Sequence, residues 1–241
     1  MSMNHASRTL TDALLDPILA SDPAGPRVTF YDDATGERVE LSALTLTNWA
    51  AKTANLLRDE FALEPGARVC VLLPAHWQTA AVLLGAWWAG AEVVLEPDER
   101  AEVALVSVDR LDDVDDVPEV AVLSLDAFGR PVPDLPVGIT DYATSVRVHG
   151  DQFRPTVAGP ALAGAGVDDV LEAARASADA QGITSTDRVS SDADWDSPDA
   201  LIGGLIAVFA AGASLVQVAN ADPSAHARRI DTEKITRQLT R

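Results

Sequence analysis

A module that occurs twice constrains this chain more than any other feature of its sequence. Each copy holds a segment ending in Arg-Val, a tryptophan, an apolar run rich in small residues, and an Ala-Gly-Ala turn before a second apolar segment. The first copy runs from Gly66 to Val94 and the second from Thr186 to Val216. A separation of about 120 residues is too long for a solenoid and suits two similar halves of one domain.

Each copy predicts a strand, a helix and a second strand. In the first copy, residues 68–73 form a continuous apolar run, which is typical of a strand inside a parallel sheet. Residues 77–89 are apolar nearly all round and predict a helix buried between layers. Gly90 and its equivalent Gly212 predict the left-handed turns that end the two helices. We therefore expect an α/β fold with a mainly parallel sheet flanked by helices, built from two pseudo-repeated βαβ-like halves.

Local signals predict the remaining elements. The predicted elements are helices at residues 9–20, 43–61 (capped by Ser42) and 167–180, a hairpin at 27–41 with its turn at 33–36, strands at 102–108, 120–125 and 145–148, a solvated turn at 112–116, and a polar, frayed helix after Asn220. We divide the chain into a first α/β subdomain at residues 1–155, a partial second α/β subdomain at 156–225 and a polar tail at 226–241.

Composition excludes several classes of partner. Hydrophobic residues make up 47% of the 241 residues, enough for a large core, and the formal net charge is −19. That charge repels phosphates and anionic lipids, so we expect neither nucleic acid nor a membrane as a partner. Cys70 is the only cysteine, so no disulfide framework exists. We expect a cytoplasmic protein without a signal peptide.

One uncharged segment, residues 200–219, is long enough to span a membrane. Gly203, Gly204 and Gln217 interrupt it, and the repeat assigns its residues to a helix, a glycine turn and a strand. We therefore expect a buried helix and strand there.

Four motifs carry a resemblance to a known family. They are Leu41-Ser42-Ala43-Leu44, Glu64-Pro65-Gly66-Ala67-Arg68-Val69, Leu72-Leu73-Pro74-Ala75-His76-Trp77 and Ala89-Gly90-Ala91-Glu92-Val93-Val94-Leu95-Glu96-Pro97. In order and spacing, this part of the chain resembles the N-terminal domain of the adenylate-forming (AMP-binding) acyl-CoA synthetase and ligase superfamily. The second copy is similar to the next subdomain of that family, which accounts for the repeat.

The resemblance implies a chemistry whose residues are not found here. The family forms an acyl-adenylate from a carboxylate and ATP and usually passes the acyl group to coenzyme A. Its phosphate loop reads [ST]SGTTGxPKG, and the corresponding stretch here, residues 156–166, keeps glycines but lacks the threonine pair and the lysine. Asp168 and Asp169 follow it and disfavour a triphosphate. The candidate residues of this degenerate loop are Thr156, Gly159, Gly164 and Gly166, and ATP or AMP is implied by the resemblance alone.

No catalytic residue and no metal site can be assigned. The other catalytic motifs of the family would lie beyond residue 241. His76 follows a strand end, where α/β folds place ligand contacts, but a structural histidine is the expectation because no partner is visible in the sequence. Residues 192–196 resemble a calcium loop, yet Ser197 and Gly203 stand where the motif needs Gly and Glu, so we expect a solvated acidic loop.

Three functions remain open from the sequence. The leading hypothesis is a non-catalytic relative of the AMP-binding acyl-CoA synthetases that acts as a binding or interaction protein. The alternatives are one half of a split or minimal synthetase, and a nucleotide or acyl sensor. A homodimer or a partner protein is expected, because half of a larger fold exposes surface that its longer relatives cover.

Overall fold

The computed structural model describes residues 8–239. In chain order the elements are α1 (Leu10–Ser21), β1 (Pro26–Asp32), β2 (Glu37–Ser42), α2 (Ala43–Asp59), β3 (Arg68–Leu72), α3 (Trp77–Trp88), β4 (Glu92–Val94), β5 (Val103–Ser107), the 3₁₀ helix η1 (Val108–Val114), β6 (Glu119–Leu123), β7 (Thr140–Asp141), α4 (Tyr142–Val146), α5 (Val167–Ala180), β8 (Arg188–Ser191), α6 (Pro198–Leu201), the π-helical turn η2 (Ile202–Ile206), α7 (Ala207–Ala210), β9 (Ser214–Ala219), α8 (Pro223–Glu233) and β10 (Arg237–Gln238).

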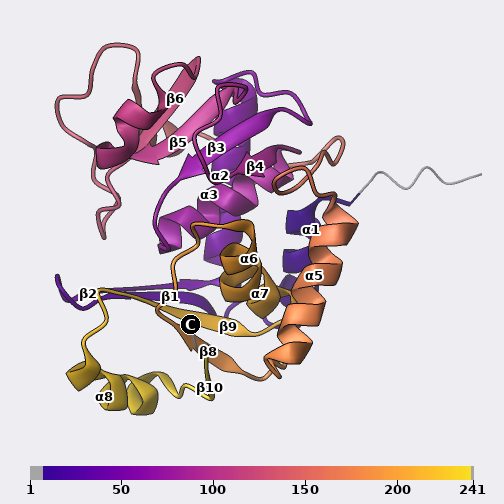
Figure 1. Cartoon of the computed structure of the whole chain (residues 1–241), viewed down its shortest axis with the longest axis vertical. Helices are drawn as coiled ribbons and strands as arrows, with labels where there is room; N and C mark the ends of the chain where they lie inside the picture. Colours follow the sequence, from indigo (N-terminus) through magenta and orange to yellow (C-terminus); the bar gives the residue numbers. More distant parts are fainter. Residues whose placement is uncertain (1–7, 240–241) are drawn as a thin grey trace, which may run out of the picture.

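The strands form two five-stranded sheets, which Figure 1 shows at the bottom and the top of the molecule. Sheet A has the order β10-β8-β9-β1-β2, and only the β1–β2 hairpin in it is antiparallel. Sheet B has the order β4-β3-β5-β6-β7 and is parallel throughout. The α/β class with mainly parallel sheets is therefore confirmed.

Helices fill the space between the two sheets. Helices α2 and α3 pack against each other beneath sheet B and reach strand β1 of sheet A, while α6 and α7 lie over sheet A (Figure 1). The first-copy helix α3 is buried on nearly every side, as its sequence predicts. A second, smaller apolar cluster covers the outer face of sheet B and includes Cys70, Val106 and Val122. Alternate residues of the β3 and β5 strands therefore serve two cores.

Both copies of the module fold as predicted. Strand β3, helix α3 and strand β4 form a parallel βαβ unit, and β8, the helical segment α6-η2-α7 and β9 form the other. Gly90 and Gly212 have φ angles of +83° and +76° and end the two helical segments. Residues 200–219 fold as helix and strand, and among residues 8–239 no helix is long and apolar enough to cross a bilayer.

Two expectations about local structure are wrong. Residues 145–148 do not form a strand, because the short helix α4 covers Tyr142–Val146. The Asp141 side chain caps it by accepting from the Thr144 N–H, and Tyr142 and Val146, four residues apart, are buried together on one face.

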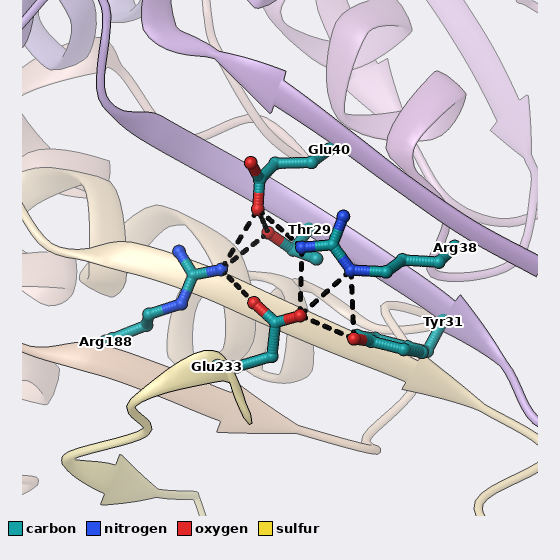
Figure 2. A network of polar contacts seen from close by, with 6 residues as sticks. All are labelled: Thr29, Tyr31, Arg38, Glu40, Arg188 and Glu233. Carbon is teal, nitrogen blue, oxygen red and sulfur yellow. Dashed lines mark hydrogen bonds and ion pairs between the residues drawn. The ribbon is translucent and has the colours of Figure 1, made fainter. Parts of the chain in front are cut away.

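The expectation for the tail is wrong in part, because the helix predicted after Asn220 is present but is not frayed. The tail forms a full helix, α8, and a strand, β10, that pairs with β8 at the edge of sheet A. Figure 2 shows what holds it: the Glu233 carboxylate accepts from Tyr31, Arg38 and Arg188 on three strands of sheet A. Arg38 and Arg188 also bind Glu40. Helix α8 is therefore held against sheet A by a network of ion pairs rather than by an apolar face.

The sheets divide the chain differently from its order in sequence. The hairpin β1–β2, near the N-terminus, pairs with β9 and so belongs to the sheet of the second copy. The division at residues 155 and 225 stays a prediction.

Candidate functional site

A cavity of about 490 Å³ lies where strands of both sheets end. From sheet A it takes the carboxyl ends of β1, β8 and β9 and the start of β2, and from sheet B the segments that follow β3 and β6. We call this cavity the acidic cleft, defined by its polar residues Asp32, Glu37, His76, Asp192, Asp194, Gln217 and Asn220. The carboxyl ends of parallel strands are where open α/β sheets bind ligands.

His76 connects the first copy of the module to this cleft. It caps helix α3, because its Nδ1 accepts from the Gln78 N–H at 3.1 Å. The neutral ring therefore carries its proton on Nε2. The side chain is 4% exposed and stands edge-on to Phe30 with ring centroids 4.3 Å apart. The structural role expected for His76 is present, and its Nε2–H remains available.

Three polar atoms that line the cleft lack hydrogen-bond partners. His76 Nε2 lies 3.7 Å from Glu37 Oε1, too far for a hydrogen bond, and neither atom has another partner. Gln217, which is 2% exposed, donates to the Ala193 carbonyl but leaves its Oε1 unpaired. Of the eight buried side-chain atoms without partners in the described part of the chain, these three meet at one cavity. Such atoms are uncommon in folded proteins and point to a site.

Four carboxylates give the cleft its charge: Asp32, Glu37, Asp192 and Asp194. Burial raises the pKa of Asp32, but hydrogen bonds from the Asn220 amide and the Ala34 N–H outweigh it and lower the pKa below its ordinary value. No described lysine or arginine lines the cavity. The field in the cleft therefore favours positive over negative charge.

The glycine loop, residues 156–166, lies at a different edge. Gly159 packs on the turns that precede β3 and β4, where a Cβ would come within 2.4 Å of the Gly90 carbonyl and 2.9 Å of the Gly66 backbone. Thr156, three residues before Gly159, is exposed. This part of the loop faces the amino ends of β3 and β4.

The second half of the glycine loop runs beside β4 and uses its own amides. Ala161 and Ala163 exchange hydrogen bonds with the Val93 backbone. The N–H groups that donate within the chain are those of Ala161, Leu162, Ala163, Ala165 and Gly166. The Gly166 N–H donates to the Asp169 side chain at 3.4 Å. A phosphate cradle needs free N–H groups, and these five are occupied.

Gly164 is the member of the loop that borders open space. With Ala163 it lines a groove of about 360 Å³ beside β4. The two arginines of that groove, Arg68 and Arg100, both bind Asp98. The loop is thus packed at Gly159, capped at Gly166 and open at Gly164. Whether Thr156, Gly159, Gly164 and Gly166 hold a ligand stays a prediction.

Two remaining expectations concern Cys70 and metals. Burial raises the pKa of Cys70 to about 11, in keeping with an inert thiol. Among residues 8–239, no three His, Cys, Asp or Glu side chains converge closely enough to hold a metal ion.

The sequence singled out His76, through its place after a strand, and Asp192 and Asp194, as part of an acidic loop, without placing them in one site. It could not assemble the rest, because Glu37, Gln217 and His76 come from segments far apart in the chain. The available signal was that several polar residues directly follow predicted strands.

Comparison with solved structures defines the class of fold. The chain superimposes on an acyl-CoA synthetase from Brucella canis with a TM-score of 0.77 at 18% identity, covering 95% of this chain and 46% of that one. It superimposes on the anthranilate CoA ligase AuaEII, solved with anthranoyl-AMP, with a TM-score of 0.73 at 16% identity, covering 96% and 49%. The chain therefore has the fold of the N-terminal domain of adenylate-forming enzymes and spans about half the length of these structures.

The family is shown by a much nearer relative. A TIGR03089 family protein of Mycobacterium tuberculosis (strain ATCC 25618 / H37Rv) is 62% identical over 239 residues, which covers 96% of this chain and 98% of that protein. The chain belongs to the TIGR03089 family. No family model matches it.

Proposed function

We propose that this chain is a non-catalytic binding protein that keeps the scaffold of adenylate-forming enzymes. The observation that carries the proposal is the hydrogen bonding of the glycine loop. N–H groups in its second half donate to the Val93 and Ala165 carbonyls and to the Asp169 side chain. Backbone N–H groups and a lysine are what hold the phosphates of ATP in such a loop.

The lysines of the chain support the same conclusion. Only Lys52 and Lys234 occur. Lys52 donates to the His149 carbonyl from helix α2, and Lys234 ends helix α8 in a left-handed conformation. Neither lines the groove beside Gly164. Four carboxylates, Glu92, Glu96, Asp98 and Asp196, line that groove, and their negative charge would repel a triphosphate.

The test is ATP–pyrophosphate exchange by the purified chain, with magnesium and a panel of aliphatic and aromatic carboxylic acids. We expect exchange no faster than in a blank without protein. Acid-dependent exchange that scales with the concentration of the chain would overturn the proposal. An active adenylate-forming enzyme, assayed in the same way, confirms that the assay detects pyrophosphate exchange.

A second candidate is one half of a split synthetase, favoured by the share of length, 46% and 49%, that the chain covers in the solved enzymes. Its test is exchange after co-purification with a protein that supplies the remaining part of that fold. Pyrophosphate exchange by the complex, with no exchange by the single chain, would favour this candidate over a binding protein.

A further inference from the structure

The acidic cleft carries an inference about ligand chemistry that deepens the proposed function and rests on it. Two features of the cleft point to a ligand. Buried polar atoms in it lack hydrogen-bond partners, and its charged residues are all acidic. We infer that it binds a small organic cation that bears a primary ammonium or guanidinium group.

Hydrogen-bonding capacity selects the polar end of the ligand. Glu37 Oε1 and Gln217 Oε1 are unpaired acceptors, and each is buried away from solvent. A ligand with several N–H donors, such as an ammonium or guanidinium group, satisfies both. The opposing donor, His76 Nε2–H, faces Glu37 at 3.7 Å and attracts that carboxylate without neutralising it. His76 is thus a positioning residue.

Charge selects the sign of the ligand. Asp32, Glu37, Asp192 and Asp194 line the cavity, and the only described nitrogen base there is His76, which the cap of α3 holds with Nδ1 as an acceptor. Arg229 of the tail binds Asp33 and lies over the Tyr31 ring, and it does not line the cleft. An anionic ligand would enter against this field, whereas a cation is drawn in.

Shape and donor spacing favour an organic cation over a metal ion. The cavity of about 490 Å³ is the size of a small-molecule site and far larger than one ion. Its carboxylates come from different strands, and among residues 8–239 no three of the side chains that ligate metals converge. Phe30, Pro74, Leu125 and Val218 provide apolar walls for the carbon chain of an amine.

The experiment is isothermal titration calorimetry of the whole chain with agmatine and with spermidine, and with AMP as the anionic comparison. We expect saturable one-to-one binding of at least one amine in the millimolar range or tighter, and none of AMP. Glu37→Gln should weaken that binding about tenfold, because one charge-assisted hydrogen bond is lost. Gln217→Met, which keeps the shape but removes the acceptor, should weaken it by a smaller factor.

The matched control is Asp116→Asn, which removes one negative charge from an acidic groove beside η1 that is lined by different residues. Its amine affinity should equal that of the unmodified chain. Melting temperatures establish that each variant is folded. Absence of saturable amine binding, or equal weakening by Asp116→Asn and Glu37→Gln, would overturn the inference. Pyrophosphate exchange reports separately on the proposed function, so the two can fail independently.

Discussion

The two copies of the module share a backbone plan but differ in what surrounds it. In the first copy, helix α3 is continuous and buried, and the glycine loop covers the turn at Gly90. In the second, the helix contains a π-helical turn at Ile202–Ile206, where Gly204 leaves room for the Trp195 indole, and Gly212 meets only Ser185. The repeat therefore specifies strand, helix and turn, whereas contacts from outside each copy decide how much a given position matters.

The equivalent arginines of the two copies, Arg68 and Arg188, also differ in the residues that they bind. Arg68 begins β3 and binds Glu92 of its own copy and Asp98 just after it, while Arg188 begins β8 and binds Glu40 and Glu233 from distant segments. The equivalent position of the module therefore forms local ion pairs in one sheet and long-range ion pairs in the other.

The largest expected difference lies at the two helix-ending glycines. At Gly90 a Cβ would stand 2.6 Å from the Val157 carbonyl, and at Gly212 the nearest atom is 3.4 Å away. Gly90→Ala should lower the free energy of unfolding by about 3 kcal/mol, because a backbone clash adds to left-handed strain. Gly212→Ala should lower it by about 1 kcal/mol from strain alone.

Urea denaturation measures both changes. The control is Gly36→Ala, at a φ of +77° with nothing within 4 Å of the added methyl group. It should match Gly212→Ala. Equal losses at Gly90 and Gly212 would show that the glycine loop does not press on the first copy.

Glu233→Gln tests the long-range ion pairs that Glu233 forms with Arg38 and Arg188. The Glu233 side chain is 4% exposed and accepts from three side chains, so we expect a loss of about 2 kcal/mol in unfolding free energy. Glu92→Gln, which disturbs the local pair with Arg68 at 3.2 Å, should lose about 1 kcal/mol. A larger loss at Glu92 would reverse the comparison between the two arginines.

The same carboxylate predicts a dependence on pH. Burial raises the pKa of Glu233, but hydrogen bonds from Arg38, Tyr31 and Arg188 outweigh it and lower the pKa from 4.5 to about 2. A lowered native pKa contributes stability above the ordinary value and loses it as the pH falls toward the native one. The stability difference between the unmodified chain and Glu233→Gln should therefore shrink between pH 4.5 and pH 2, measured by urea unfolding at several pH values. A difference that stays constant over that window would contradict the network.

Most elements of the fold followed from local pattern. The periodicity of residues 167–180 gave helix α5 with the bounds that the structure has, and the apolar run after Gly66 gave β3. Helix α4 was missed because five residues are too few for a helical period, and only the Asp141 cap marked it. The tail was misread because its buried residues, Arg229 and Glu233, are charged and pair with strands far away in the sequence.

The smallest effect expected concerns thiol reactivity. Cys70 of β3 is fully buried, and its equivalent in β8, Ser190, is partly exposed. Because burial raises the pKa of Cys70 to about 11, iodoacetamide should leave the native chain unmodified at mildly alkaline pH and label it after unfolding. In a Cys70→Ser background, Ser190→Cys should react in the native state. Fast labelling of native Cys70 would show that the outer face of sheet B is open.

The most direct test of the account maps where ligands touch the chain. We expect backbone amide resonances of Glu37, Gln217 and Asn220 in the acidic cleft to shift when agmatine is titrated, and those of Gly164 and Gly166 to stay in place when ATP and magnesium are added. Saturable shifts at Gly164 and Gly166 with ATP, and none in the cleft with agmatine, would contradict this account. They would indicate that the glycine loop binds nucleotide.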